Sequence, residues 1–156
     1  MVRESPKGPL RWILQAPAWL YRARLGWLLG RRFLMIEHRG RKSGRLYRTV
    51  VEVVDRPRTE GGERFVLSGF GPRTDWYRNI RGGNLVAIWI GSKRCRATMR
   101  FVEPEEASDV MLGYETAHPT AAKVLAVELG LDYDGTPEGR LQVMREIPMV
   151  AFTPDC

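Results

Sequence analysis

The chain has 156 residues, of which 44% are hydrophobic, which is enough for one buried core and favours a single domain over residues 1–156. The formal net charge is +7, and the excess is local, because residues 1–48 carry twelve Lys or Arg against two Glu, while the rest carries thirteen against sixteen Asp or Glu. This distribution predicts an anionic ligand or an anionic membrane surface near the N-terminal third, and it disfavours nucleic acid because the basic residues alternate with apolar ones instead of forming one exposed face.

The first thirty residues combine a polar start with a stretch rich in Trp and Leu. Residues 1–9 contain two prolines and are expected to be disordered, and residues 10–30 predict a helix with Pro17 in its first turn. The longest uncharged run, 12–21, is too short to span a bilayer, and arginines follow it where a secretory signal needs small residues. Two interpretations stay open: a helix that packs on the domain and covers its ligand groove, or an interfacial helix that touches anionic lipid.

The rest of the chain alternates between strand and helix signals. Alternating and β-branched runs predict six short strands, at 33–38, 46–54, 63–70, 85–90, 95–102 and 147–152. Capping residues and glycines predict a short helix over about 75–80, with Thr74 or Asp75 as its N-cap, and three later helices over about 103–117, 121–129 and 136–146. This order predicts an α+β fold, namely a small, six-stranded, mostly antiparallel barrel with helices packed outside it.

A basic turn joins the first two predicted strands, with the sequence Arg39-Gly40-Arg41-Lys42-Ser43-Gly44-Arg45. Its glycines let the backbone turn sharply and expose N–H groups, and no carboxylate accompanies its cationic side chains. Such a turn suits an anion, most often a phosphate. The alternative is a solvated hairpin turn that is basic by composition alone. The turn is not a P-loop, because Arg41 stands where that motif needs glycine.

A second Gly-rich stretch, 68–72, leads from the third predicted strand into the short helix. The helix start directs free N–H groups and the positive end of its dipole into this loop, where a phosphate or the carbonyl-rich edge of a ring would fit. Trp76 and Tyr77 follow on the helix, and core packing is the more common role for such rings. Asn79 has a simpler alternative role as a cap of the helix end.

The cysteines and histidines indicate neither disulfides nor a metal. Cys95 lies in a predicted strand and Cys156 is the last residue, so the two make no disulfide framework, which fits a reducing cytosol. His38 and His118 are the only histidines, and no Cys/His cluster has metal-ligand spacing, so we predict no metal.

Three segments carry a family resemblance. They are Gly40-Arg41-Lys42-Ser43-Gly44, then Ser68-Gly69 with Asp75-Trp76-Tyr77-Arg78-Asn79-Ile80, and the closing Ile147-Pro148-Met149-Val150. In these segments the chain resembles the deazaflavin-dependent nitroreductase family, split β-barrel proteins that use coenzyme F420. The resemblance runs from about residue 33 to residue 154, with an N-terminal helix before it.

The resemblance implies that F420 lies in the barrel groove. The basic turn and the next strand would meet its phosphate and acidic glutamyl tail through Arg41, Lys42, Ser43 and Arg48. The second loop and the short helix would meet the phosphate and the deazaflavin region through Ser68, Gly69, Asp75, Trp76, Tyr77, Arg78 and Asn79. A flavin mononucleotide (FMN) enzyme on the same barrel is the runner-up, since it needs the phosphate site but not the cationic mouth.

The implied reaction is hydride transfer from the reduced coenzyme to an electron-poor acceptor, such as an activated alkene, a quinone or a nitro compound. The proton would come from solvent or from a hydroxyl such as that of Tyr114. Nitroimidazole-reducing members carry tyrosines near the position of His118, which would either replace one as a donor or cap the next helix. Val50 and Thr74 stand where other members have proline. These departures favour a different substrate.

The alternative to an enzyme is a non-catalytic split barrel that binds a deazaflavin, a flavin or a lipid-like ligand. We expect a cytoplasmic protein, with peripheral contact at the inner face of the membrane through residues 10–30 and a homodimer as further options.

Overall fold

The computed structural model describes residues 33–55, 62–131 and 133–156. The expected disordered start, 1–9, and the expected N-terminal helix, 10–30, lie outside the described residues, so both stay predictions.

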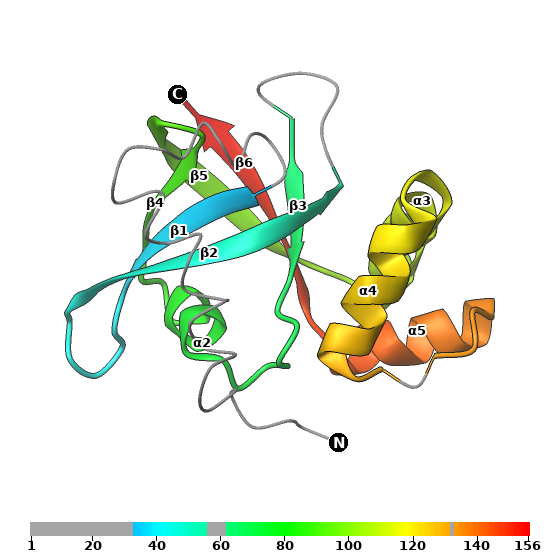
Figure 1. Ribbon diagram of the computed structural model, residues 1–156. Coiled ribbons are helices and arrows are strands. Elements are labelled where there is room, and N and C mark those ends of the chain that lie inside the picture. The colour runs from blue at the N-terminus through cyan, green and yellow to red at the C-terminus, as the bar shows by residue number, and fades with distance from the viewer. Residues whose placement is uncertain (1–32, 56–61, 132) are drawn as a thin grey trace.

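Six strands form a closed barrel (Figure 1). They are β1 (Phe33–Arg39), β2 (Leu46–Asp55), β3 (Arg64–Leu67), β4 (Leu85–Ile90), β5 (Lys93–Val102) and β6 (Met149–Asp155). Around the barrel they follow the order β1-β2-β3-β6-β5-β4, and every neighbouring pair is antiparallel. Because β1 pairs with both β2 and β4, the sheet has no free edge. The predicted fold class is confirmed.

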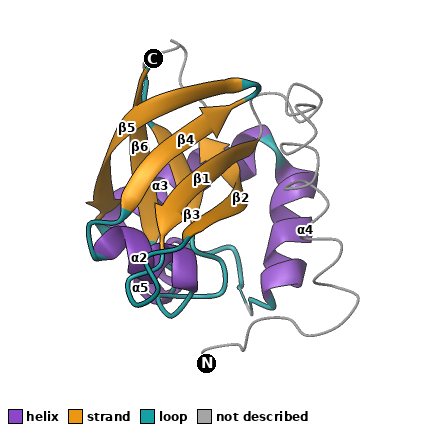
Figure 2. Cartoon of the chain, turned by 90° about the vertical axis from the view of Figure 1, so that its left-hand side faces the viewer, coloured by secondary structure: helices purple, strands orange, loops and turns teal. Residues whose placement is uncertain are grey.

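The inside of the barrel is filled by alternate residues of its strands. Leu34 and Ile36 of β1 and Val66 of β3 are fully buried there. A short helix, α2 (Asp75–Arg81), lies at one end of the barrel and adds buried side chains to the same core, Trp76 and Ile80 among them (Figures 1 and 2). The barrel end at α2 is therefore closed by a helix rather than left open.

Three longer helices lie together on one side of the barrel (Figure 1). They are α3 (Pro104–Ala117), α4 (Pro119–Leu129) and α5 (Pro137–Glu146). Met111 of α3 and Met144 of α5 join a second core with the outward-facing Phe65 and Ala151 of the barrel wall. Within the described part of the chain, no helix is both long enough and apolar enough to cross a membrane.

Some predicted element boundaries were wrong. β3 ends at Leu67 instead of residue 70, because a turn follows in which the N–H of Gly71 donates to Ser68 O at 2.8 Å. β6 starts at Met149 and continues to Asp155, because Ile147 still serves as the C-cap of α5 and the pairing with β5 continues to Asp155. α4 begins two residues earlier than expected, at Pro119, which tolerates the first helical turn.

The prediction that the cysteines form no disulfide was wrong. Cys95 of β5 is bonded to Cys156, and their Cα atoms are 4.7 Å apart. The β5–β6 register pairs Arg96 with Asp155, and it thereby brings together two cysteines that are 61 residues apart in sequence. The cysteines therefore no longer support a reducing compartment, and the cytoplasmic location stays a prediction.

Candidate functional site

The turn between β1 and β2 is closed by hydrogen bonds at both of its glycines. The N–H of Gly40 donates to Arg45 O and that of Gly44 donates to Gly40 O, each at 2.8 Å. Gly44 has a φ of +67°, which favours glycine, and a Cβ at Gly40 would force the side chains of Ser43 and Tyr47 to shift. Ser43 Oγ accepts a hydrogen bond from the N–H of Arg45 at 3.3 Å, which keeps this hydroxyl inside the turn.

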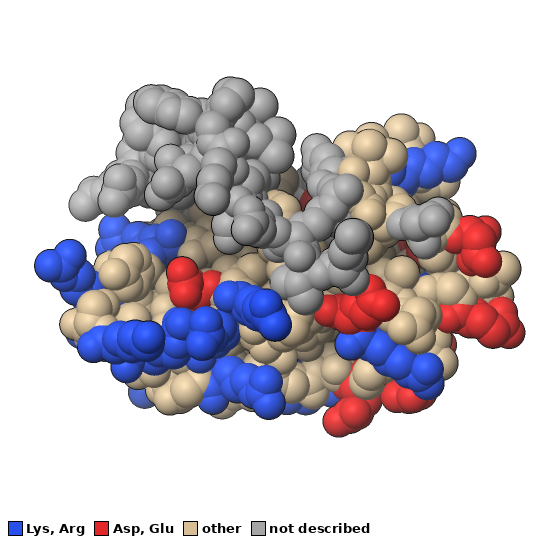
Figure 3. Space-filling view, turned by 90° about the horizontal axis from the view of Figure 1, so that it is seen from below, with Lys and Arg blue, Asp and Glu red and all other residues tan. Residues whose placement is uncertain are grey.

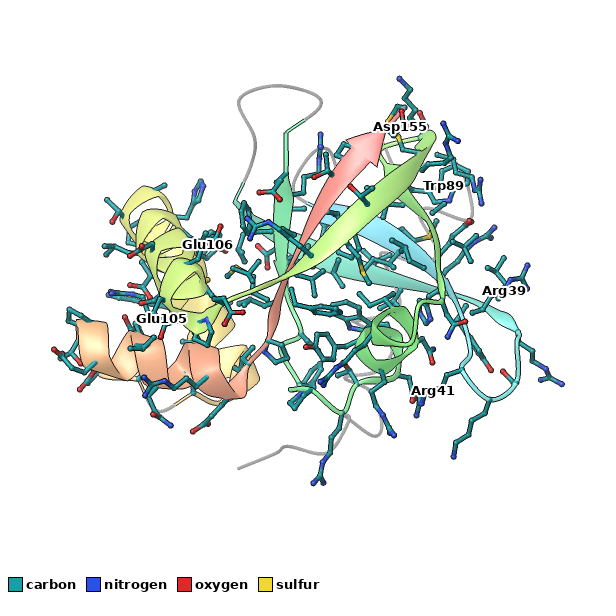
Figure 4. All side chains as sticks on the ribbon, turned by 180° about the vertical axis from the view of Figure 1, so that it is seen from behind. Arg39, Arg41, Trp89, Glu105, Glu106 and Asp155 are labelled. Carbon is teal, nitrogen blue, oxygen red and sulfur yellow. A yellow bond between two sulfur atoms is a disulfide. The ribbon has the colours of Figure 1, made fainter. Side chains whose placement is uncertain are left out.

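Helix α2 anchors this turn through Arg41. The N–H of Arg41 donates to Asn79 Oδ1 at 3.1 Å, and its Nη1 donates to the same oxygen at 3.0 Å. Arg41 Nη1 also lies 3.3 Å from Asp75 Oδ1, in a pair whose carboxylate side chain is 84% exposed. Figure 4 shows Arg41 extending beside α2. The position of the turn therefore depends on a helix more than thirty residues further along the chain.

A groove of about 410 Å³ lies between the turn, β2 and α2. This volume is within the usual range of small-molecule sites. Seven of the predicted cofactor-binding residues line it: Arg41, Lys42, Ser43, Arg48, Asp75, Trp76 and Asn79. Two segments that the sequence marked separately thus meet in one site.

Four predicted cofactor-binding residues do not line the groove: Ser68, Gly69, Tyr77 and Arg78. The hydroxyl of Ser68 is fully buried, donates to Gly71 O at 2.8 Å and lies 2.6 Å from Thr74 Oγ1, so it holds its own loop together. Tyr77 is 7% exposed and packs edge-on against Phe101, with ring centroids 5.6 Å apart. For Tyr77 the core-packing interpretation is confirmed.

Trp76 and Asn79 are both buried and both line the groove. Trp76 packs edge-on against Tyr77 and belongs to the barrel core, so it serves packing and lines the site at once. The side chain of Asn79 does not cap the helix end, because its oxygen is taken by Arg41 and its nitrogen lies 3.0 Å from His38 Nδ1.

The groove also contains four residues that were not among the predicted cofactor-binding residues, namely His38, Gly40, Tyr47 and Thr49, of which Gly40 belongs to the predicted basic turn. His38 is 2% exposed, and its Nε2 lies 3.0 Å from Thr49 Oγ1. Burial lowers the pKa of His38 to about 4, although the charge of Asp75 opposes this shift. The sequence contained a signal for this site, because His38 is a polar residue that continues the alternation of the inward-facing Leu34 and Ile36.

Arg48 is fixed at the groove by Glu37, which is 1% exposed. Glu37 Oε1 accepts from Arg48 Nε at 3.0 Å and from Trp89 Nε1 at 2.9 Å, and Oε2 accepts from Arg94 Nε at 2.9 Å. Burial by itself raises the pKa of Glu37, but the hydrogen bonds from Trp89, Arg94 and Arg48 outweigh it and hold the pKa below its ordinary value. The carboxylate is therefore charged and keeps Arg48 in place.

The two candidate proton donors lie away from the groove. Tyr114 of α3 is buried, and its hydroxyl donates to Glu52 Oε1 at 3.1 Å. His118 is exposed between α3 and α4, and as the N-cap residue of α4 it makes no capping bond through its side chain. A proton-donor role for either residue stays a prediction.

Positive charge gathers around the groove. In the view from below (Figure 3), most Lys and Arg lie on the half of the molecule with the β1–β2 turn and α2, and most Asp and Glu lie toward α3 to α5. The cations of the turn, the α2 loop and α2 are Arg39, Arg41, Lys42, Arg45, Arg73, Arg78 and Arg81. Among the residues lining the groove the carboxylate is Asp75, which is paired with Arg41. A polyanion fits this surface.

A second cavity of about 640 Å³ lies among α3, α4 and α5. Its lining is mostly apolar, with a polar end where Glu115 Oε2 accepts from Arg140 Nη2 at 2.8 Å and from Tyr133 Oη at 3.2 Å. It shares no lining residue with the groove, so the two are separate sites. Across the described residues, no three His, Cys, Asp or Glu side chains gather as a metal site, and the absence of a metal stays a prediction.

Comparisons with known proteins agree with this description. Residues 16–123, more than half of the chain, match the family model described as F420H(2)-dependent quinone reductase. A solved F420-H2 dependent reductase (FDR-A) is 21% identical over 79% of this chain and 95% of its own, with a TM-score of 0.51. A structure described as a domain-swapped dimer is 20% identical over 93% of this chain and 99% of its own, also with a TM-score of 0.51. No curated protein matches significantly.

The two structural matches show a shared fold, and the family match confirms the resemblance to proteins that use F420. The groove fits this coenzyme chemically. The phosphate and the glutamyl tail of the coenzyme are anionic, and the β1–β2 turn supplies cations, a hydroxyl and backbone N–H groups. The chain therefore belongs to the family of F420H(2)-dependent quinone reductases and is an oxidoreductase whose cofactor is coenzyme F420.

Proposed function

We propose that the protein binds reduced F420 along the groove and uses it to reduce an electron-poor small molecule, with quinones as the first class to test. The observation that supports this most directly is the groove, where Arg41, Lys42 and Ser43 on a glycine-bounded turn lie beside the buried Trp76. When bound, the reduced coenzyme supplies a hydride as a two-electron donor. The chain has to hold it, orient it and admit the acceptor.

Each groove residue has a role that follows from its contacts. Lys42 and the guanidinium groups of Arg41 and Arg48 attract the phosphate and the tail carboxylates, and Ser43 offers a hydroxyl to a phosphate oxygen. Trp76 gives the groove an apolar surface suited to a ring system. Asp75 would repel an anion, so its role is to hold Arg41 through their ion pair.

For the four residues outside the groove we propose supporting roles. Ser68 and Gly69 shape the loop that leads into α2, with the Ser68 hydroxyl bonded within that loop. Tyr77 packs α2 against the barrel, and Arg78 adds positive charge on the exposed face of α2.

Quinones are the first acceptor class because the family to which the chain belongs is that of F420H(2)-dependent quinone reductases. Nitro compounds and activated alkenes are also electron-poor and remain part of the proposal. Solvent is the simplest proton source, because the Tyr114 hydroxyl is engaged by Glu52 and neither Tyr114 nor His118 lines the groove.

The test begins with a fluorescence titration of the purified protein with oxidised F420 and, separately, with FMN, at low and high salt. Reduced F420 is then mixed with protein and a soluble quinone, a nitroaromatic or an activated enone, and loss of the reduced coenzyme is followed. Salt-sensitive binding of F420 with turnover of a quinone is the expected result. Preference for FMN, or F420 binding without turnover of any acceptor, would contradict the proposal.

A further inference from the structure

We infer that His38, neutral and carrying its proton on Nε2, is a positioning residue that fixes the coenzyme-binding turn through Asn79. This inference deepens the proposed function and rests on it only for its effect on coenzyme binding. The effect of His38 on the turn is indirect. His38 is hydrogen-bonded to Asn79, and Asn79 is hydrogen-bonded to Arg41 of the turn.

The chain of hydrogen bonds has one consistent assignment. Both groups of Arg41 that meet Asn79, the backbone N–H and Nη1, can only donate. The atom of Asn79 that they share must therefore be the carbonyl oxygen, and its amide nitrogen faces His38 Nδ1 at 3.0 Å. Since that nitrogen also only donates, Nδ1 must accept and carry no proton. The ring proton then lies on Nε2 and is donated to Thr49 Oγ1 at 3.0 Å.

Burial makes this arrangement a strong constraint. His38 and Asn79 are each 2% exposed, so water does not compete for their bonds. A proton added to Nδ1 would oppose two donors across the His38–Asn79 contact. Turning the amide over would satisfy His38 but would place its NH₂ group against the donors of Arg41. The first change breaks the bond that holds Asn79, and the second breaks the bonds from Asn79 to Arg41.

The surroundings of His38 favour the neutral ring. Across β1–β2, Tyr47 stacks on it with ring centroids 6.0 Å apart, and β4 brings Leu85 opposite. α2 brings Asp75, whose charge acts toward protonation, and the turn brings Arg41, a cation. Burial prevails over Asp75, and the pKa of His38 is lowered to about 4.

The first test needs no coenzyme. NMR of ¹⁵N-histidine-labelled protein at neutral pH reports which ring nitrogen is protonated, and His118→Phe, which removes the only other histidine, assigns the signals. The expected result is a protonated Nε2 and an unprotonated Nδ1 on His38. A protonated Nδ1 would overturn the inference.

Asn79→Asp tests the coupling to Asn79. A carboxylate cannot donate to Nδ1 and favours the charged ring, so the pKa of His38 should rise from about 4 in this variant. Arg41 retains an acceptor there, which favours folding. An unchanged pKa in a folded variant would show that Asn79 does not control the ring.

His38→Phe tests the effect on the site. Affinity for F420 should fall about tenfold, the size expected if Asn79 is no longer held in place and its charged hydrogen bond with Arg41 is lost. The slope of affinity against salt should persist, since no cation is removed, and His118→Phe should bind as the wild type does. A folded His38→Phe with unchanged affinity would overturn the inference. Failure of the wild type to bind F420 would instead overturn the proposed function.

Discussion

Two neighbouring residues of β1, Glu37 and His38, face opposite sides of the barrel wall, and each fixes one arginine of the groove. Glu37 bonds Arg48 directly, and His38 acts on Arg41 through Asn79. Both residues are buried, at 1% and 2% exposure. At the scale of single residues, the placement of the cations thus originates in polar groups that never reach solvent.

Glu37→Gln should lower the free energy of unfolding by about 2 kcal/mol at pH 7, because Arg48 and Arg94 lose a charged acceptor but remain half-exposed to water. The native pKa of Glu37 is held below its ordinary value, so its stabilisation is complete above the unfolded-state pKa and is lost as the pH falls through the native value. Urea unfolding of the wild type and of the variant at pH 7 and near pH 3 measures the difference in their free energies of unfolding.

The difference in the free energy of unfolding between the wild type and Glu37→Gln should therefore become smaller at acidic pH. Glu105→Gln, an exposed change in the first turn of α3, is the matched control and should cost only a few tenths of a kcal/mol. A gap that stays constant with pH would mean that the charge of Glu37 does not contribute.

Lys42→Glu should weaken F420 binding about tenfold or more at low salt, because it reverses a charge that lines the groove. The loss should shrink as salt rises and screening increases. Lys123→Glu makes the same change in net charge on α4, outside the groove, and separates local from overall charge. Fluorescence titrations at several salt concentrations measure both variants, and equal losses would argue against a local contact.

At the scale of elements, α2 links the core to the groove. It has seven residues, too few to be stable alone, so its helical form depends on packing. Trp76, Tyr77 and Ile80 enter the barrel core, Asn79 anchors the turn, and Arg78 and Arg81 occupy the last turn, where the helix dipole favours cations. The groove therefore forms only when α2 is packed against the end of the barrel.

Trp76→Ala should destabilise the protein by about 3–5 kcal/mol, the usual cost of deleting a large buried ring. It should also abolish the salt-sensitive coenzyme binding, because α2 no longer holds the turn. Trp76→Phe keeps a ring in the core and should retain most of the stability and part of the binding. Thermal unfolding and coenzyme titration check this, and Trp76→Ala with wild-type stability would show that α2 is not seated by this ring.

At the scale of the whole molecule, the fold separates charge. The basic turn and α2 lie at one end, while the acidic side chains accumulate toward α3 to α5 (Figure 3). Such a separation raises the local concentration of an anionic ligand at the basic end. The disulfide is not part of the groove. It joins Cys95 of β5 to Cys156, which directly follows β6.

Cys156→Ser should lower the free energy of unfolding by about 2–4 kcal/mol, because the bond closes a long loop of the unfolded chain. A reducing agent should lower the melting temperature of the wild type to that of the variant and leave the variant unchanged. Coenzyme affinity should be unaffected, since neither cysteine lines the groove. Two titratable thiols in the native protein under oxidising conditions would contradict the bond.

The sequence by itself determined the six strands, the barrel class, the basic turn and the starts of α2 and α5, because alternation, glycines and capping residues act between neighbours in the chain. Only the tertiary structure decided which side chains meet. It turned Ser68 and Tyr77 away from the groove, joined Cys95 to Cys156, and brought His38 to Asn79, 41 residues away. Such partnerships depend on strand register and on the seating of α2 in the barrel, and these are set by packing between distant segments rather than by any local pattern.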